Sequence, residues 1–171
     1  LGTPEARRDL SVSLDNVGWV AEARGEWDVA EAAYRESLEI RRGLEESLGT
    51  PEARRDLSVS LNNVGRVAEA RGEWDTAEAA YRESLGLARG LEESLGTPEA
   101  RRDLSVSLNN VGRVAEARGE WDTAEEAYRE SLEIRQELDD LLGTPQAQQD
   151  VSTSQENLNR LSQKRADLGD L

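Results

Sequence analysis

The sequence predicts an all-α fold, an α-solenoid in which antiparallel helix pairs stack one after another. One long segment occurs three times, each copy displaced by 47 residues, at Leu14–Tyr34, Leu61–Tyr81 and Leu108–Tyr128. The tract Leu-Gly-Thr-Pro also recurs, starting at Leu1, Leu48, Leu95 and Leu142. A fixed period in this range is typical of stacked-repeat architectures. Within each copy the apolar residues recur at helical spacing, which indicates helices.

We therefore expect a single repeat domain over residues 1–171. Its predicted parts are repeat 1 (1–47), repeat 2 (48–94), repeat 3 (95–141) and a capping helix (142–171). Only 36% of the residues are hydrophobic. A stack tolerates this composition because each unit buries a thin layer against its neighbours and needs no large central core.

The first helix of the middle repeat is expected over about 51–71. Thr50 is the predicted N-cap, and Pro51 takes the first helical position, where its missing N–H costs nothing. Gly72 ends the helix because glycine adopts the left-handed conformation without steric cost. Between these signals runs an apolar stripe with spacings of three and four: Ala53, Leu57, Leu61, Val64 and Ala68.

The second helix follows at once and is expected to reach about residue 94. Asp75 is its predicted cap, with Glu78 completing a capping box and Trp74 packing back as a hydrophobic staple. So short a connection forces the two helices to lie antiparallel and in contact. The small residue Gly65 allows close approach, and Tyr81 is expected to fill the space between repeats.

The C-terminal segment keeps Leu-Gly-Thr-Pro and then becomes polar. One narrow apolar stripe remains, whereas Gln, Asn, Ser, Thr and Lys occupy most other positions. A stack needs a terminal unit with a polar outer face, so this segment is predicted to be a capping helix. The stripe consists of Ala147, Val151, Ser154, Leu158, Leu161 and Leu168.

Composition excludes several classes of function. A net charge of −15 repels nucleic acid and anionic lipid, since binding either requires clustered Lys and Arg. The chain has no His and no Cys, so serine nucleophiles lack their usual base and soft-metal sites lack ligands. The glycines punctuate helix ends and form no phosphate-binding loop. We expect a cytoplasmic protein that is not an enzyme and that has no metal, no cofactor, no nucleic-acid partner and no membrane partner.

The repeated residues resemble the tetratricopeptide repeat family. The resemblance rests on Gly65, the turn Gly72-Glu73-Trp74, Ala77 and Tyr81, and on their equivalents in the other copies. The period is 47 residues instead of the usual 34, which is a departure from the family pattern. The Leu-Asn-Asn start and the Ser-Leu-Glu-Ile-Arg sequence of the second helix resemble the long-repeat branch typified by kinesin light chain, and also repeat arrays attached to bacterial signalling ATPases and proteases. The resemblance implies a right-handed superhelix whose first helices line a concave groove for peptides or partner helices.

The same resemblance implies the residues of that groove. Asparagine amides can pair with the main chain of an extended peptide, and Arg can bind a carboxylate with two hydrogen bonds. The alternative is that Arg66 and Glu69 form a solvated pair and that the Asn residues bond between helices. The implied groove residues are Asp15, Asn16, Trp19 and Glu22, then Asn62, Asn63, Arg66 and Glu69, then Asn109, Asn110, Arg113 and Glu116.

Differences between the copies single out Trp19. Repeats 1 and 2 differ at six positions: Asp15/Asn62, Trp19/Arg66, Val29/Thr76, Glu39/Gly86, Ile40/Leu87 and Arg41/Ala88. An exposed Trp is a natural binding anchor. The alternative is that another helix covers it. The recurring Trp27, Trp74 and Trp121 are assigned to packing, as are Tyr34, Tyr81 and Tyr128.

Paired arginines occupy the first turn of each first helix. Ion pairing across the loop to the acids that end the preceding helix is the favoured interpretation, and an anion-binding row is the alternative. The arginines are Arg7-Arg8, Arg54-Arg55 and Arg101-Arg102, and the acids are Glu45, Glu46, Glu92 and Glu93.

The predicted function is that of a protein–protein interaction scaffold that binds a peptide or partner helix in its groove. The chain is expected to be a monomer or to self-associate weakly. Two alternatives stay open: a regulatory or sensor array of a larger bacterial signalling ATPase or protease, and a self-associating structural repeat. The polar capping helix argues against self-association at the C-terminal end.

Overall fold

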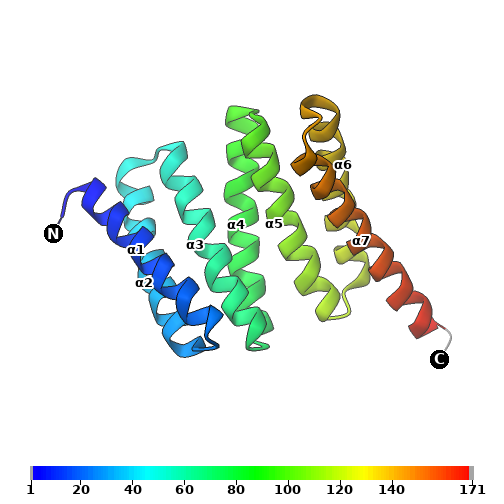
Figure 1. Ribbon diagram of the computed structural model, residues 1–171, viewed down its shortest axis with the longest axis horizontal. Helices are drawn as coiled ribbons and strands as arrows, with labels where there is room; N and C mark the ends of the chain where they lie inside the picture. Colours follow the sequence, from blue (N-terminus) through cyan, green and yellow to red (C-terminus); the bar gives the residue numbers. More distant parts are fainter. Residues whose placement is uncertain (1, 170–171) are drawn as a thin grey trace. The chain divides into compact units, whose positions relative to one another are not determined.

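The computed structural model describes residues 2–169, with side chains described for residues 2–167; the side chain of Leu168, part of the predicted stripe, lies outside that range. Over the described part the fold is all-α, as predicted, and contains no strand. The helices follow one another through short connections (Figure 1). They are α1 (Pro4–Ala23), α2 (Trp27–Leu48), α3 (Pro51–Ala70), α4 (Trp74–Leu95), α5 (Pro98–Ala117), α6 (Trp121–Leu142) and α7 (Pro145–Gly169).

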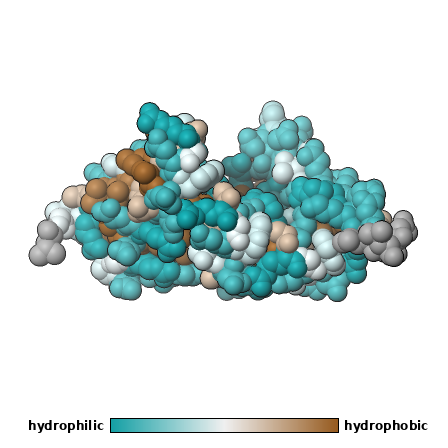
Figure 2. Space-filling view, turned by 90° about the horizontal axis from the view of Figure 1, so that it is seen from below, coloured by the Kyte–Doolittle hydropathy of each residue, from teal (hydrophilic) through white to brown (hydrophobic). Residues whose placement is uncertain are grey.

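The chain divides into two compact units, Leu1–Leu87 and Ala88–Leu171, and each is described by itself. In the first unit α2 packs on both α1 and α3, and α1 also touches α3 directly. In the second unit α6 packs in the same way on both α5 and α7. Apolar surface gathers over the first repeat, at the left of the view in Figure 2.

The first helices begin as predicted. In the three repeats the Thr Oγ1 atoms of Thr3, Thr50 and Thr97 accept hydrogen bonds from the backbone N–H three residues on, at 3.3, 3.2 and 3.2 Å. Proline occupies the first helical position each time. The expected glycine turn after the middle first helix is also present, with φ of +74° at Gly72.

The cap predicted at Asp75 is wrong, because α4 begins at Trp74 and Asp75 lies within its first turn. Repeats 1 and 3 have the same arrangement. Helix α2 begins at Trp27, and its N-cap is Glu26, whose side chain makes no capping hydrogen bond. The turn at Gly25 is tight enough for the Glu26 N–H to reach the carbonyl of Ala21 at 2.9 Å, so the chain enters the helix earlier than expected. Asp28 therefore lies inside the first turn, where its negative charge interacts favourably with the positive end of the helix dipole. Glu120 takes the same uncapped position before α6.

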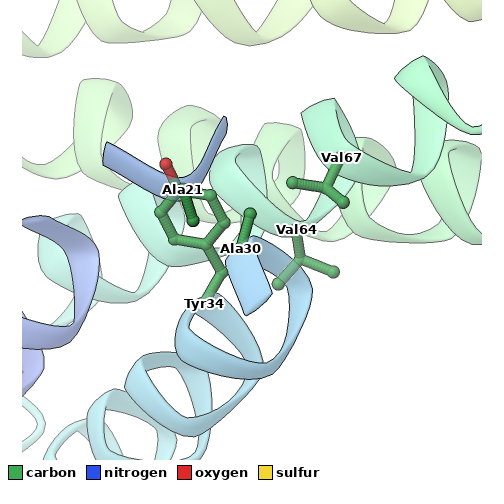
Figure 3. Packing of buried hydrophobic residues seen from close by; sticks show 5 residues of the cluster. All are labelled: Ala21, Ala30, Tyr34, Val64 and Val67. Atoms are coloured by element: carbon green, nitrogen blue, oxygen red, sulfur yellow. The ribbon is translucent and has the colours of Figure 1, made fainter. Parts of the chain in front are cut away.

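In each helix pair a glycine of the first helix packs against a tyrosine ring of the second helix. A Cβ on Gly18 would lie 2.5 Å from Cε1 of Tyr34, so only glycine lets α1 approach the ring this closely. Figure 3 shows Tyr34 beside Ala21 and Ala30, with Val64 and Val67 from the neighbouring helix α3. Trp27 and Leu38 pack against the same cluster. The three tyrosines are buried, and Trp27 and Trp121 pack against the core, as predicted, whereas Trp74 is 36% exposed.

The second unit repeats this core. Tyr128 is fully buried, and a Cβ on Gly112 would lie 2.6 Å from its ring. Ala115, Ala124 and Leu161 complete the cluster, so α7 closes the unit with its apolar stripe.

Candidate functional site

The exposed face of α1 and α3 carries part of the predicted groove. Asn16 and Trp19 are exposed on α1, and the neighbouring position Val12 is exposed as well. On α3 Asn63 is half-buried and Arg66 is exposed. Spacings of four and three residues place these side chains in one row along each helix. Two short rows of mixed apolar and amide side chains therefore lie on neighbouring first helices.

A hollow of about 380 Å³ opens at one end of these rows. Trp19, Glu22 and Ala23 of α1 line it together with Trp27 of α2 and Arg66 of α3. Trp19 is 66% exposed, the highest value among the large hydrophobic side chains of the described residues. Trp27 is half-buried because one side of its indole packs on the core. The hollow thus brings two indoles and one ion pair together from three helices.

Sequence reasoning named three of these residues and missed Trp27 as a lining residue. It assigned Trp27 to packing because the residue recurs at every turn. The usable signal was the length of the turn, since only Arg24, Gly25 and Glu26 separate α1 from α2. So short a connection places the first residue of α2 beside the last turn of α1.

Arg66 is bound within the protein. Its Nε and Nη2 donate to the two carboxylate oxygens of Glu22, both at 2.8 Å. The Tyr34 hydroxyl donates to Glu22 Oε2 at 2.9 Å and accepts from Arg66 Nη2 at 3.1 Å. The guanidinium lies 5.8 Å from the centroid of the Tyr34 ring. Arg66 is thus engaged by the preceding repeat, where we expected it to bind a partner carboxylate or to pair with Glu69.

The surroundings of Tyr34 and Arg66 raise the pKa of both side chains. Burial, and then the hydrogen bond to Glu22, raise the pKa of Tyr34 to about 12. Burial lowers the pKa of Arg66, but the hydrogen bonds and charge of Glu22 together with Tyr34 outweigh that effect and raise the pKa overall. The charges of Arg66 and Glu22 offset each other at the wall of the hollow.

The equivalent position in the second unit is covered. Glu116 is 5% exposed and accepts from Arg160 Nε and Nη2 at 3.1 and 2.9 Å, from Lys164 at 2.7 Å and from the Tyr128 hydroxyl at 2.9 Å. Burial raises the pKa of Glu116, but these donors outweigh it and lower the pKa to about 2. Helix α7 therefore occupies the place where a ligand would have to reach Glu116.

Two other predicted residues point into the helix pairs. Asp15 forms an ion pair with the buried Arg41 of α2 at 2.6 Å. Asn109 is buried, and with its amide oxygen directed at α6 it accepts from Arg135 Nη2 at 2.8 Å. The Asn109 contact corresponds to the alternative in which the amides bond between helices. Asn62, Asn110 and Glu69 are half-buried, and Arg113 is exposed.

The paired arginines form ion pairs between helices. Arg54 reaches Glu45 at 3.3 Å and Arg101 lies 3.9 Å from Glu92, in line with the favoured interpretation. Arg8 instead binds Asp56 of the next first helix at 2.6 Å. A hollow of about 210 Å³ at this edge is lined by Glu5, Glu52 and Asp56 as well as by Arg8 and Arg41. Acids on its walls do not favour an anion.

No helix of the described chain combines the length and the apolar character needed to cross a membrane. Across residues 2–167 no group of acidic side chains is arranged to hold a metal ion.

Comparison with known proteins identifies the repeats. The profile of the tetratricopeptide repeat matches residues 10–45 and 104–138, and a second profile of the same description matches residues 60–95. Together these segments cover more than half of the chain. The crystal structure of BtubC (BKLC) from P. vanneervenii is similar, with a TM-score of 0.62 and 18% identity over 99% of this chain and 67% of that one. The crystal structure of the de novo designed helical repeat protein DHR64 has a TM-score of 0.49 and 18% identity, over 99% of this chain and 100% of that one. A search of curated protein sequences finds no match.

Proposed function

Because this chain belongs to the tetratricopeptide repeat family, whose repeats generally mediate protein–protein interaction, we propose that it is a non-catalytic scaffold that binds a partner segment across α1 and α3. The observation that carries this proposal is the hollow between Trp19 and Trp27, walled by the Arg66–Glu22 pair. Two indole side chains beside an arginine are the composition of a binding hot spot.

The hollow favours an uncharged side chain of the partner. Both indoles offer apolar surface, and the one guanidinium on the wall already has its carboxylate. A partner carboxylate would compete with Glu22 for Arg66, and a partner cation would compete with Arg66 for Glu22. An aromatic or branched aliphatic residue gains contact area without disturbing the pair.

The rest of the face suits an extended main chain. Asn63 Oδ1 accepts a hydrogen bond from Arg66 Nη2 at 3.4 Å, and its amide nitrogen is the donor that we propose for a partner carbonyl. Asn16 supplies a second amide one repeat away, and the exposed Val12 and Val59 flank the amides with apolar surface. An amide has both a donor and an acceptor, so this pair grips peptide groups with little choice of sequence.

The net negative charge of the protein favours basic residues on either side of the partner's anchor residue. At −15 the chain attracts basic segments and accelerates their encounter. We therefore propose a partner segment with one aromatic or aliphatic anchor and basic residues on either side. The site is preformed by the Gly18–Tyr34 contact and the Arg66 pair, so binding avoids the ordering cost of a flexible receptor.

The test is a selection of random peptides displayed on phage against the whole chain, followed by affinity measurements on two variants. Trp19→Arg installs the residue that repeats 2 and 3 carry at this position, and Val29→Thr does the same at an exposed apolar position outside the hollow. Both replacements are already compatible with the fold. Enriched peptides should bind Trp19→Arg at least about ten-fold more weakly and Val29→Thr unchanged. Equal loss in both variants, or in neither, contradicts the proposal.

A further inference from the structure

A second surface lies on α1, on a different side of the helix from the hollow. Ala6, Leu10, Ser13, Val17 and Val20 recur at spacings of four and three residues, the pattern of a helix-packing seam. Leu10, Val17 and Val20 are 49%, 52% and 41% exposed. The hydrophobic area over the first repeat in Figure 2 belongs to this end of the molecule.

The same side chains are buried one repeat later. Helix α3 has an identical seam, in which Leu57, Val64 and Val67 are only 5%, 5% and 1% exposed. They are covered by α2, whose Tyr34 and Leu38 belong to the same clusters. In the second unit α6 covers Leu161 of α7, the equivalent of Val20, in the same manner. The structure thus shows twice what kind of helix fits this seam.

The covering helices share one set of residues. Reading along α2, a small residue, an aromatic, a leucine and an arginine follow at intervals of four, four and three, as Ala30, Tyr34, Leu38 and Arg41. Arg41 Nη1 donates to the backbone carbonyl of Asp56 at 2.9 Å, and in the second unit Arg135 does the same to Asp150 at 2.8 Å. The same four residue types recur in α6 at Ala124, Tyr128, Leu132 and Arg135.

The polar groups of the α1 seam are left without their inter-helix partners. Ser60 on α3 lies 3.3 Å from Ser37 of α2, whereas Ser13 turns back to the carbonyl of its own Asp9 at 3.0 Å. Asp56 binds Arg8, whereas Asp9 makes no ion pair among the described residues. The seam therefore offers the Ser13 hydroxyl as well as apolar area, and the Asp9 carboxylate lies one turn before Ser13.

We propose that this seam of α1 docks a single amphipathic helix of a partner protein that carries the small–aromatic–leucine–arginine face of α2. Trp19 favours a single helix over a whole repeat. At its position α3 and α7 have Arg66 and Arg160, which bind the Glu and Tyr of the preceding helix pair. A full repeat docked on α1 would leave that carboxylate without its guanidinium, whereas a lone helix brings no such carboxylate.

A second copy of the chain does not fit the seam. The aromatic centres of the α2-type faces are Tyr34, Tyr81 and Tyr128, and none is more than 1% exposed. A folded copy therefore has no α2-type face to present. The proposal therefore assigns the seam to a partner helix and not to a second copy.

The experiment titrates the whole chain with a labelled synthetic peptide that has the sequence of residues 27–48, and measures fluorescence anisotropy. Binding should weaken at least about ten-fold in the double variant Leu10→Gln/Val17→Gln, since both side chains lose apolar burial. The matched variant Val12→Gln/Val59→Gln changes two exposed residues of the proposed peptide face and should bind the helix as well as the unchanged chain. A peptide with Tyr34→Ala should bind more weakly to all three proteins.

Two results would overturn the proposal. One is a peptide that does not bind, or that binds the Leu10→Gln/Val17→Gln variant equally well. The other is sedimentation showing a dimer of the unchanged chain that Leu10→Gln/Val17→Gln abolishes, which would assign the seam to self-association. Neither result bears on the hollow, because its variants, Trp19→Arg and Val29→Thr, leave the seam intact.

Discussion

Arg66 of α3 binds Glu22 of α1 with two hydrogen bonds of 2.8 Å each, so an arginine of the second repeat forms the wall of a hollow that otherwise belongs to the first. The Tyr34 hydroxyl joins both residues, because it donates a hydrogen bond to Glu22 and accepts one from Arg66. This cluster links stacking to the proposed binding site, because the contact that joins two repeats also shapes the hollow.

Replacing Arg66 by Lys should cost about 1 kcal/mol of unfolding free energy, because Lys keeps the charge and loses the two-pronged geometry. The value is modest since the Arg66 side chain is 46% exposed and water screens the pair. Arg35→Lys, at an exposed i,i+4 pair with Glu31, is the matched control and should change stability by at most about 0.5 kcal/mol. Urea unfolding followed by circular dichroism measures both. Equal losses of unfolding free energy in the two variants would mean that the two hydrogen bonds from Arg66 to Glu22 contribute nothing beyond the charge of Arg66.

Gly18→Ala should destabilise the protein by about 1–3 kcal/mol, because the new methyl would lie 2.5 Å from the buried Tyr34 ring. Gly86→Ala should stabilise it by about 1 kcal/mol, since Gly86 lies in a helix interior with no neighbouring atom in the way. Thermal unfolding of the two variants should therefore shift in opposite directions. A Gly18→Ala protein as stable as the unchanged chain would show that the ring contact is loose.

Arg41→Ala should cost about 2–3 kcal/mol, because it leaves the half-buried carboxylate of Asp15 without its cation. The double variant Asp15→Asn/Arg41→Ala should recover most of that loss. Repeat 2 already has this combination, with Asn62 and Ala88 at the equivalent positions. Denaturant unfolding of the single and double variants measures the recovery, and no recovery would refute the ion-pair interpretation.

Glu116 should make the free energy of unfolding depend on pH in the acidic range. Its pKa falls from 4.5 to about 2 on folding, so its contribution is complete above pH 4.5 and is lost as the pH falls toward 2. Glu116→Gln should cost about 2 kcal/mol at pH 7 and flatten the decline in stability below pH 4.5. Glu133→Gln, at an exposed position of α6, is the control and should leave the pH profile unchanged. Parallel acid profiles for all three proteins would contradict the assignment.

The period and the glycine positions made the fold predictable. Gly72 and Thr50 have local signatures, since a left-handed turn and an N-cap are decided by residues next to them in the sequence. The cap at Asp75 was predicted wrongly because the tightness of the Gly72 turn depends on a hydrogen bond from the Glu73 N–H back to the carbonyl of Ala68, which no local pattern records.

The partners of the site residues were harder to predict. From the sequence, Arg66 has Glu69 three positions away, and only the register between α1 and α3 selects Glu22 instead. The roles of Asp15 and Asn109 depend on which side of the first helix faces α2 or α6. That choice is made by the Gly18–Tyr34 and Gly112–Tyr128 contacts across the pair.

The most direct test of the proposed function is an NMR titration of the whole chain with a selected peptide, following the indole N–H signals of its four tryptophans. We predict that the signals of Trp19 and Trp27 shift with the bound fraction, while those of Trp74 and Trp121 serve as internal references and stay in place. Saturable binding in which Trp19 and Trp27 do not move, or in which all four signals move alike, would contradict a binding site in the hollow of the first repeat.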